Sequence, residues 1–220
     1  MIKTKDHDKK QGKISFVTDM SISLVNAIRR SLLEIPIMAI DEVEILQNDS
    51  ALFDEVLAHR LGLVPIKTEK TSKEIKFKIK EVGPKIVYST DLKPSVETDY
   101  KLPITLLDNE QEIQLVAIAR IGKGVEHIKY SPGLMYYRHN VDKDIVNFVN
   151  IDEDGKVSYD ERELKEKCNQ EQAEKIKKLK EVNELFVGLE SWGQLDVKKM
   201  FTEAIDILDK NLAELNKEIK

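Results

Sequence analysis

The sequence predicts an α+β protein that combines amphipathic helices with half-buried strands. Strict alternation of apolar and polar residues at 74–80 is typical of a half-buried strand. At 111–121 an apolar residue stands at every second position from Ile113 to Ile121, which indicates a longer strand with one apolar face. Apolar residues recur three and four positions apart near both ends of the chain, which is typical of amphipathic helices. A chain of 220 residues can form one large domain or two small ones, and either can bury a core.

In the first half of the chain, the charged segment 1–12 is either frayed or an edge strand, and a strand follows at 13–17. A helix then begins at Asp19 or Ser21, because either side chain can accept a hydrogen bond from the first exposed N–H groups. It runs to about Glu34 and ends before a proline. After it we expect a strand at 38–46, a short helix within 50–61 capped by Gly62, and strands at 74–80 and 85–90.

The second half carries strands and two further helices. We expect a strand at 111–121 and a turn at 122–124, then strands at 134–139 and 184–190, and a mostly polar helix at 160–182. The last helix runs from about Asp196 to the end, with a heptad stripe of Phe201, Ile205, Leu208, Leu212, Leu215 and Ile219. The stripe packs either on the protein's own sheet or on a partner helix. Because it reaches the last residues with no later strand to cover it, we favour the partner.

Composition limits the protein's class and location. Hydrophobic residues make up 41% of the chain and charged residues 34%, and no apolar run approaches the roughly 18 residues of a membrane helix. The single Cys168 excludes a disulfide framework and a multi-cysteine metal site, so we expect a cytoplasmic protein without membrane contact. The net charge of −5, with no separate basic block, argues against direct sequence-specific nucleic-acid binding.

The sequence offers no catalytic residues. It contains no nucleophile elbow, phosphate-binding loop or cluster of zinc ligands. The four histidines lie in four different segments, and no two are spaced to face one another on a helix.

An acidic turn resembles the calcium loop of an EF-hand. Asn150, Asp152, Asp154 and Glu161 occupy loop positions 1, 3, 5 and 12, with Gly155 at position 6. Position 1 is Asn rather than Asp, the preceding residues are β-branched, and there is no second loop. A plain acidic turn is therefore favoured over a calcium site.

Four segments in a defined order carry a resemblance to a known family: Asn26–Leu33, Ala58–Ile66, Gly122–Gly124 with His127 and Tyr130–Pro132, and Leu189–Gly193 ahead of a long helix. In this combination the chain resembles the archaeal D-type subunits of DNA-directed RNA polymerase, which are the counterparts of the third-largest subunit of eukaryotic RNA polymerase II. It is more distantly similar to the amino-terminal domain of the bacterial alpha subunit.

The resemblance implies a discontinuous dimerisation domain, 1–46 and 132–220, that carries an inserted, mainly β domain at 47–131. Members of the family catalyse nothing themselves; they are assembly scaffolds within a DNA-directed RNA polymerase, the nucleotidyltransferase complex. The resemblance further implies a heterodimer with the smaller subunit L, followed by subunits N and P and the second-largest subunit. The implied dimer residues are Leu24, Ile28, Leu32, Phe201, Ile205, Leu208, Leu212 and Leu215.

Two adjacent arginines and the only tryptophan add further expectations. Arg29 and Arg30 lie about 100° apart on a helix, so both cannot face the core. They are either solvated or paired with Glu34, or, as the resemblance implies, they contact the second-largest subunit. Trp192 is more readily a core anchor than a binding residue.

Some family members hold an iron–sulfur cluster or zinc through several cysteines, and the single Cys168 excludes such a cofactor here. Two rival functions remain beside the polymerase subunit: a self-pairing scaffold and a calcium-responsive regulator.

Overall fold

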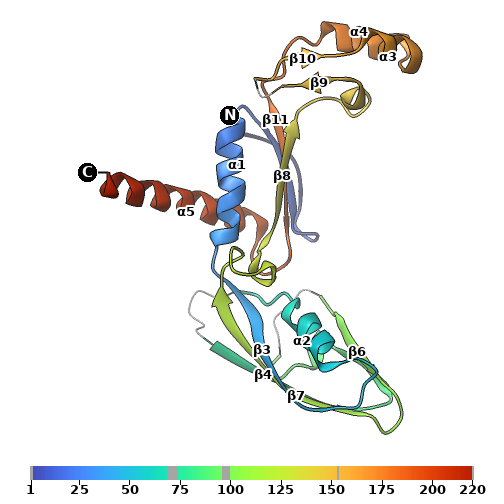
Figure 1. The fold of residues 1–220 in the computed structure, drawn as a ribbon, viewed down its shortest axis with the longest axis vertical. Helices are drawn as coiled ribbons and strands as arrows, with labels where there is room; N and C mark the ends of the chain where they lie inside the picture. The colour runs from blue at the N-terminus through green and yellow to red at the C-terminus, as the bar shows by residue number, and fades with distance from the viewer. Residues whose placement is uncertain (1, 69–73, 96–99, 153, 220) are drawn as a thin grey trace. The chain divides into compact units, whose positions relative to one another are not determined.

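The computed structural model describes residues 2–68, 74–95, 100–152 and 154–219 (Figure 1). Contacts between Cα atoms divide the chain into two compact units, each discontinuous in sequence. The first unit comprises residues 1–29 and 135–189, and the second comprises residues 30–134 and 190–220. The mixed α+β class is as predicted. The division at residues 46 and 132 that the resemblance implies stays a prediction.

The first unit is built on a four-stranded sheet in the order β1-β2-β11-β8. Its strands are β1 (Ile2–Asp8), β2 (Lys13–Thr18), β8 (Gly133–His139) and β11 (Leu185–Ser191), the last two continuing into the second unit. β1 pairs antiparallel with β2, so the charged leader is an edge strand rather than a frayed end. Helix α1 (Ile22–Ser31) follows β2, and the chain continues as a 3₁₀ helix, Leu32–Glu34.

A small satellite with its own core lies within the first unit. It contains a 3₁₀ turn (Val146–Phe148), strands β9 (Asn150–Ile151) and β10 (Val157–Ser158), and helices α3 (Glu161–Lys167) and α4 (Gln170–Lys178). Its buried side chains are Val141, Ile145, Leu164, Ile176 and Val182.

The single helix expected at 160–182 is wrong, because the chain leaves the helical conformation at Cys168. Asn169 then caps α4 by accepting a hydrogen bond from the backbone N–H of Gln172, and the Gln172 side chain accepts one from the N–H of Asn169. This reciprocal capping box stabilises the start of a new helix.

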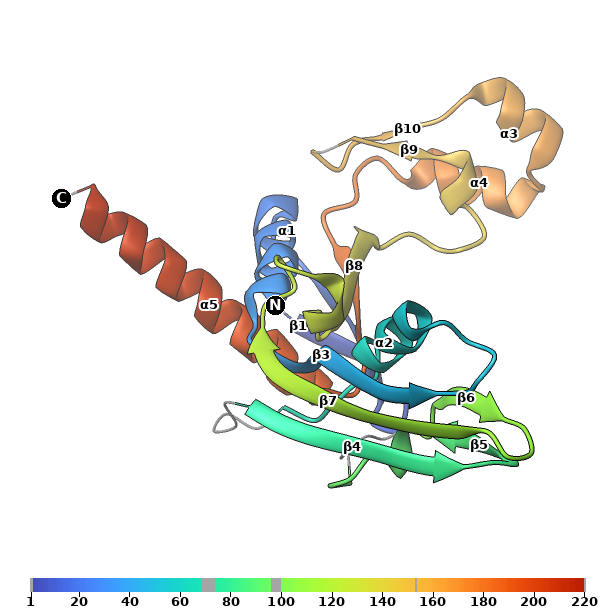
Figure 2. The same ribbon diagram turned by 60° about the horizontal axis from the view of Figure 1, so that its bottom comes forward.

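The second unit is built on a three-stranded antiparallel sheet, β3-β7-β4 (Figure 2). These strands are β3 (Ile37–Asn48), β7 (Glu112–Gly122) and β4 (Glu74–Val82). Helix α2 (Asp54–Gly62) contacts β3, and the short strands β5 (Lys85–Tyr88) and β6 (Pro103–Leu107) form a separate pair. The largest buried side chains of this core are Met38, Ile40, Leu57, Leu61, Ile66, Phe77, Ile79, Leu92, Ile104, Leu107, Ile113 and Leu115.

Two details of this unit differ from the sequence-based expectations. Gly62 is the last residue of α2 rather than its cap; Leu63 takes the cap position with a φ of −88°, so no left-handed residue is needed there. Strand β6 was not predicted, and the Arg60 guanidinium ties α2 to it by donating from Nη2 to the carbonyl of Pro103 at 2.8 Å.

Helix α5 (Val197–Glu218) completes the second unit and begins within one residue of its predicted start. The side chain of Asp196 accepts hydrogen bonds from the backbone N–H groups of Lys198 and Lys199, which caps the helix. None of the helices in the described residues is long and apolar enough to cross a membrane.

Candidate functional site

The heptad stripe of α5 changes from covered to open along the helix. Near its start, Val197, Met200 and Ala204 are buried, and Phe201 is half-buried. Farther along, exposure rises, and the stripe residues exposed there are Ile205 (39%), Leu212 (56%), Leu215 (52%) and Ile219 (76%). The second half of α5 therefore presents an apolar face to solvent, the opposite of the polar surface expected of an unpartnered helix.

Two contacts fix the direction in which this open half points within its unit. In the turn before α5, the hydroxyl of Ser191 donates to the carbonyl of Leu195, and Met200 is buried in the first turns of the helix. Farther along, the side-chain amide of Asn211 donates to the carboxylate of Glu34, with distances of 3.1 and 3.3 Å to its two oxygens. The helix is thus held in place before any partner binds, which lowers the entropy lost on association.

The dimer residues predicted in and just after α1 differ widely in exposure. Leu24 is 42% exposed, whereas Ile28 and Leu32 are 3% and 2% exposed. A side chain that its own chain already buries can offer little new contact area to a partner. The structure therefore leaves Leu24 as the accessible member of this group, and the partner contact itself stays a prediction.

The two adjacent arginines have different surroundings. Arg29 is half-buried, and its Nε and Nη2 donate to Asn26 Oδ1 at 3.1 and 2.8 Å, one turn earlier on α1. Arg30 is exposed. Arg29 thus uses two of its five N–H donors within its own helix, Arg30 is the more exposed of the two, and contact of either arginine with another subunit stays a prediction.

Ion pairs connect β3 with the residues that follow β7. Asp41 Oδ1 accepts a hydrogen bond from Lys129 Nζ at 2.6 Å and another from the Tyr130 hydroxyl at 2.9 Å. The Lys129 bond is the main reason why the pKa of Asp41 is lowered. Burial, followed by the bond to Asp41, raises the pKa of Tyr130 to about 12. The phenol therefore stays protonated and continues to donate.

An apolar groove lies beside this network in the second unit. It has a volume of about 460 Å³ and is lined by residues from four separate parts of that unit: Leu33, Leu63, Pro65, Ile128, Lys129, Ser131, Gly133, Leu134, Trp192 and Gln194. We call it the Trp192 groove. The expectation that Trp192 is a core anchor is wrong, because 44% of this residue is exposed in the wall of the groove.

The acidic loop forms a tight turn between β9 and β10. One carboxylate oxygen of Asp152 accepts hydrogen bonds from the backbone N–H groups of Asp154 (3.0 Å) and Lys156 (2.8 Å). Gly155 supplies the positive φ of 83°. Instead of an EF-hand helix, a 3₁₀ turn precedes this loop. Within the described ranges, no three His, Cys, Asp or Glu side chains are grouped to hold a metal ion.

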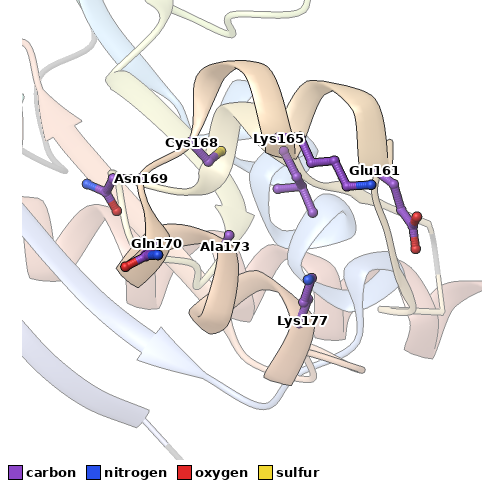
Figure 3. A pocket seen from close by; sticks show the side chains of 8 residues that line it. Glu161, Lys165, Cys168, Asn169, Gln170, Ala173 and Lys177 are labelled. Atoms are coloured by element: carbon purple, nitrogen blue, oxygen red, sulfur yellow. The ribbon is translucent and has the colours of Figure 1, made fainter.

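Glu161, the last of the predicted calcium ligands, lies instead in the pocket between α3 and α4 (Figure 3). This pocket has a volume of about 360 Å³ and is also lined by Lys165, Lys177 and Cys168, which is a free cysteine. It brings together one thiol and charged side chains from two short surface helices.

Comparison with known proteins identifies the family. A family model described as the RNA polymerase Rpb3/Rpb11 dimerisation domain matches residues 16–212. The chain is 39% identical over 156 residues to DNA-directed RNA polymerase subunit Rpo3 of Pyrococcus horikoshii, a match that covers 63% of the chain and 60% of that relative. Rpo3 of Methanocaldococcus jannaschii is 38% identical over 156 residues, covering 68% of the chain and 82% of that relative.

A third relative, Rpo3 of Thermococcus kodakarensis, is 37% identical over 174 residues, covering 70% of the chain and 67% of the relative. The chain thus spans about three fifths to two thirds of the Pyrococcus horikoshii and Thermococcus kodakarensis relatives. The family model covers nearly the whole chain and includes the predicted stripe of α5 as far as Leu212. The chain therefore belongs to the RNA polymerase Rpb3/Rpb11 dimerisation-domain family.

Proposed function

We propose that this chain is a non-catalytic assembly subunit of a DNA-directed RNA polymerase and that α5 pairs with the smaller subunit L. The observation that carries the proposal is the open half of the α5 stripe, where Leu212 and Leu215 are each more than half exposed. Full burial of an exposed leucine is worth roughly 1.5–3 kcal/mol, so covering the exposed half of Leu212 and of Leu215 contributes roughly 1 kcal/mol each, and several such side chains together favour association. Membership of a dimerisation-domain family supports the same reading.

Membership of the family also supports further partners within the polymerase. We propose that the heterodimer then joins subunits N and P and the second-largest subunit, with the exposed Arg30 as a contact to the last of these. A guanidinium on a helix surface suits this role because it can donate paired hydrogen bonds to carboxylates and carbonyls. Catalysis belongs to the complete nucleotidyltransferase complex.

We further propose that the chain works without an iron–sulfur cluster. Such a cluster takes four cysteine thiolates, and this sequence has one.

The test is co-expression with a candidate subunit L from the same genome, followed by gel filtration with light scattering. A one-to-one heterodimer is expected, and the double substitution Leu212→Glu and Leu215→Glu should abolish it. The matched control is Leu46→Glu with Leu106→Glu, which changes two leucines of the same unit that are similarly exposed (55% and 64%) but lie outside α5.

Three results would contradict the proposal. One is a chain that stays monomeric in the presence of subunit L. Another is a heterodimer that tolerates the α5 glutamates as well as it tolerates the control pair. The third is a stable homodimer that excludes subunit L, which would instead support the self-pairing scaffold.

A further inference from the structure

The Trp192 groove is a second exposed apolar surface, made of other residues than the α5 stripe. Each of the four segments that carry the family resemblance supplies at least one of its wall residues: Leu33, Leu63 with Pro65, Ser131 and Trp192. These segments are far apart in the sequence, so the fold of the second unit brings them together. Internal packing alone does not account for this wall, because Leu63 and Trp192 are 49% and 44% exposed.

The electrostatics of the groove favour an uncharged occupant. Among the described residues, Lys129 is the only charged one that lines it, and its Nζ lies 2.6 Å from Asp41 Oδ1 with only 15% of the side chain exposed. The walls are thus close to neutral, although 34% of all residues in the chain are charged. A nucleic-acid backbone or a charged peptide would lose hydration here without gaining a counter-charge, whereas an apolar segment would not.

One polar atom in the wall distinguishes a polypeptide from a lipid chain. Gln194 is 6% exposed, and its side-chain Nε2 donates to the carbonyl of Ser131 at 3.3 Å, which fixes the orientation of the amide. Its Oε1 accepts no hydrogen bond from the part of the chain that the structure describes. This acceptor is itself buried, so a backbone N–H reaches it only if the wall moves on binding, whereas an acyl chain has no donor to offer in any case.

We propose that the Trp192 groove binds an uncharged apolar segment of another polymerase subunit. The segment inserts large apolar side chains between Leu63, Ile128 and Trp192 and turns a backbone N–H toward Gln194. The volume of about 460 Å³ lies in the range of about 300–1,000 Å³ typical of pockets that enclose whole ligands, so it accommodates side chains rather than a single water. This inference rests on the proposed function, because that function makes the occupant a polymerase subunit.

The single tryptophan makes the groove directly observable. Incorporation of 5-fluorotryptophan into the full chain gives one ¹⁹F signal, because the sequence contains one Trp. The probes are unlabelled subunits L, N and P and the unlabelled second-largest subunit, all from the same genome. They are added singly and then together. Subunit binding in the groove should move this signal and reduce its sensitivity to replacement of H₂O by D₂O.

A matched pair of variants separates the groove from the rest of the surface. Ile128→Ser changes a groove residue that is 67% exposed, and Leu106→Ser changes a residue that is 64% exposed on β6, outside the groove. Both side chains are mostly in solvent, so neither change should prevent folding, which thermal melts check. Ile128→Ser should lower the affinity for the subunit that moves the ¹⁹F signal by at least about tenfold. Leu106→Ser should leave this affinity unchanged.

Cross-linking tests the chemistry of the occupant. A photoreactive benzoylphenylalanine at position 128, irradiated in the assembled complex, should capture a peptide that carries large apolar residues and no charge at the linked site. Capture of a charged segment, of nucleic acid, or of a second copy of this chain would overturn the proposal.

The remaining outcomes are equally decisive. An assembled complex with an unchanged ¹⁹F signal, or equal affinities for Ile128→Ser and Leu106→Ser, would overturn the groove inference while pairing with subunit L stays intact. A signal that moves with the concentration of the chain alone would indicate self-association and would also overturn it. Failure to pair with subunit L in gel filtration would instead contradict the proposed function.

Discussion

The hydrogen bond from Tyr130 to Asp41 should make the second unit sensitive to alkali. The Tyr130 side chain is 6% exposed, its hydroxyl lies 2.9 Å from Asp41 Oδ1, and its pKa is raised from 10.0 to about 12. The fold therefore favours the protonated phenol over the phenolate. This stabilisation is complete below the unfolded pKa of 10.0 and is lost as the pH rises through the folded pKa of about 12.

The magnitude follows from the difference between the two pKa values. One pKa unit corresponds to about 1.4 kcal/mol, so the full loss amounts to roughly 3 kcal/mol, of which roughly 1 kcal/mol is gone by about pH 11. Tyr130→Phe removes both the hydrogen bond and the ionisable group. Near neutral pH the variant should be less stable by about 0.5–1.5 kcal/mol, the net contribution of one such bond, while Asp41 keeps its bond to Lys129.

Two measurements check this reasoning. Urea unfolding, followed by the fluorescence of Trp192 in the same unit, should show that the stability advantage of the native chain over Tyr130→Phe shrinks or reverses between neutral pH and about pH 11. Ultraviolet titration of the phenolates, native minus variant, isolates one of the six tyrosines and should give a midpoint near 12. A midpoint near 10, or an advantage that does not change with pH, would refute the argument.

Three further predictions concern a close contact, an ion pair and the acidic loop. Gly122→Ala places a Cβ 2.5 Å from a tyrosine ring and should destabilise the second unit by about 1–3 kcal/mol in thermal melts. Gly62→Ala is the matched control: the atom nearest to its Cβ would lie at 3.6 Å, so it should not destabilise the unit. Glu42→Gln removes one of three carboxylates around the surface residue Arg120 and should leave the unfolding midpoint almost unchanged, so a large drop would contradict this view. Calorimetric titration with millimolar calcium should give no binding heat, because backbone N–H groups already occupy an oxygen of Asp152; a saturable signal would revive the calcium site.

The parts of the fold that the sequence predicted are those in which burial has a clear period. In β4, Phe77 and Ile79 are 2% and 1% exposed, whereas Lys76, Lys78 and Lys80 are exposed, so alternation in the sequence matches alternation in the structure. The start of α5 was predictable because Asp196 is a capping residue ahead of an apolar stripe.

The errors arose where a local signal was weak or was overlooked. The break between α3 and α4 had a signal in the sequence, since Asn169 and Gln172 have capping-box spacing, but the surrounding charge resembled one continuous polar helix. Strand β6 is five residues long and begins at Pro103, a residue that weakens a strand signal, so neither the strand nor its pairing with β5 could be inferred from the local pattern. Pairing of this kind depends on tertiary context rather than on intrinsic preference.

The candidate sites also include one that the sequence predicted and one that it did not. The sequence predicted the residues of the α5 stripe and favoured an uncovered part of it. It did not predict where along the helix the change from buried to exposed occurs, because that depends on where the rest of the unit ends. The Trp192 groove was missed altogether, because its wall comes from four segments that no local pattern connects.

The open half of α5 also affects how much of this chain a cell can maintain. A leucine-rich face in water is the kind of surface that promotes aggregation and that proteases and chaperones recognise. On the proposed function, copies made in excess of subunit L keep this face uncovered, so they are removed faster than paired copies. The abundance of the chain would then follow that of its scarcer partner without any dedicated regulator, and polymerase assembly would begin from balanced pairs.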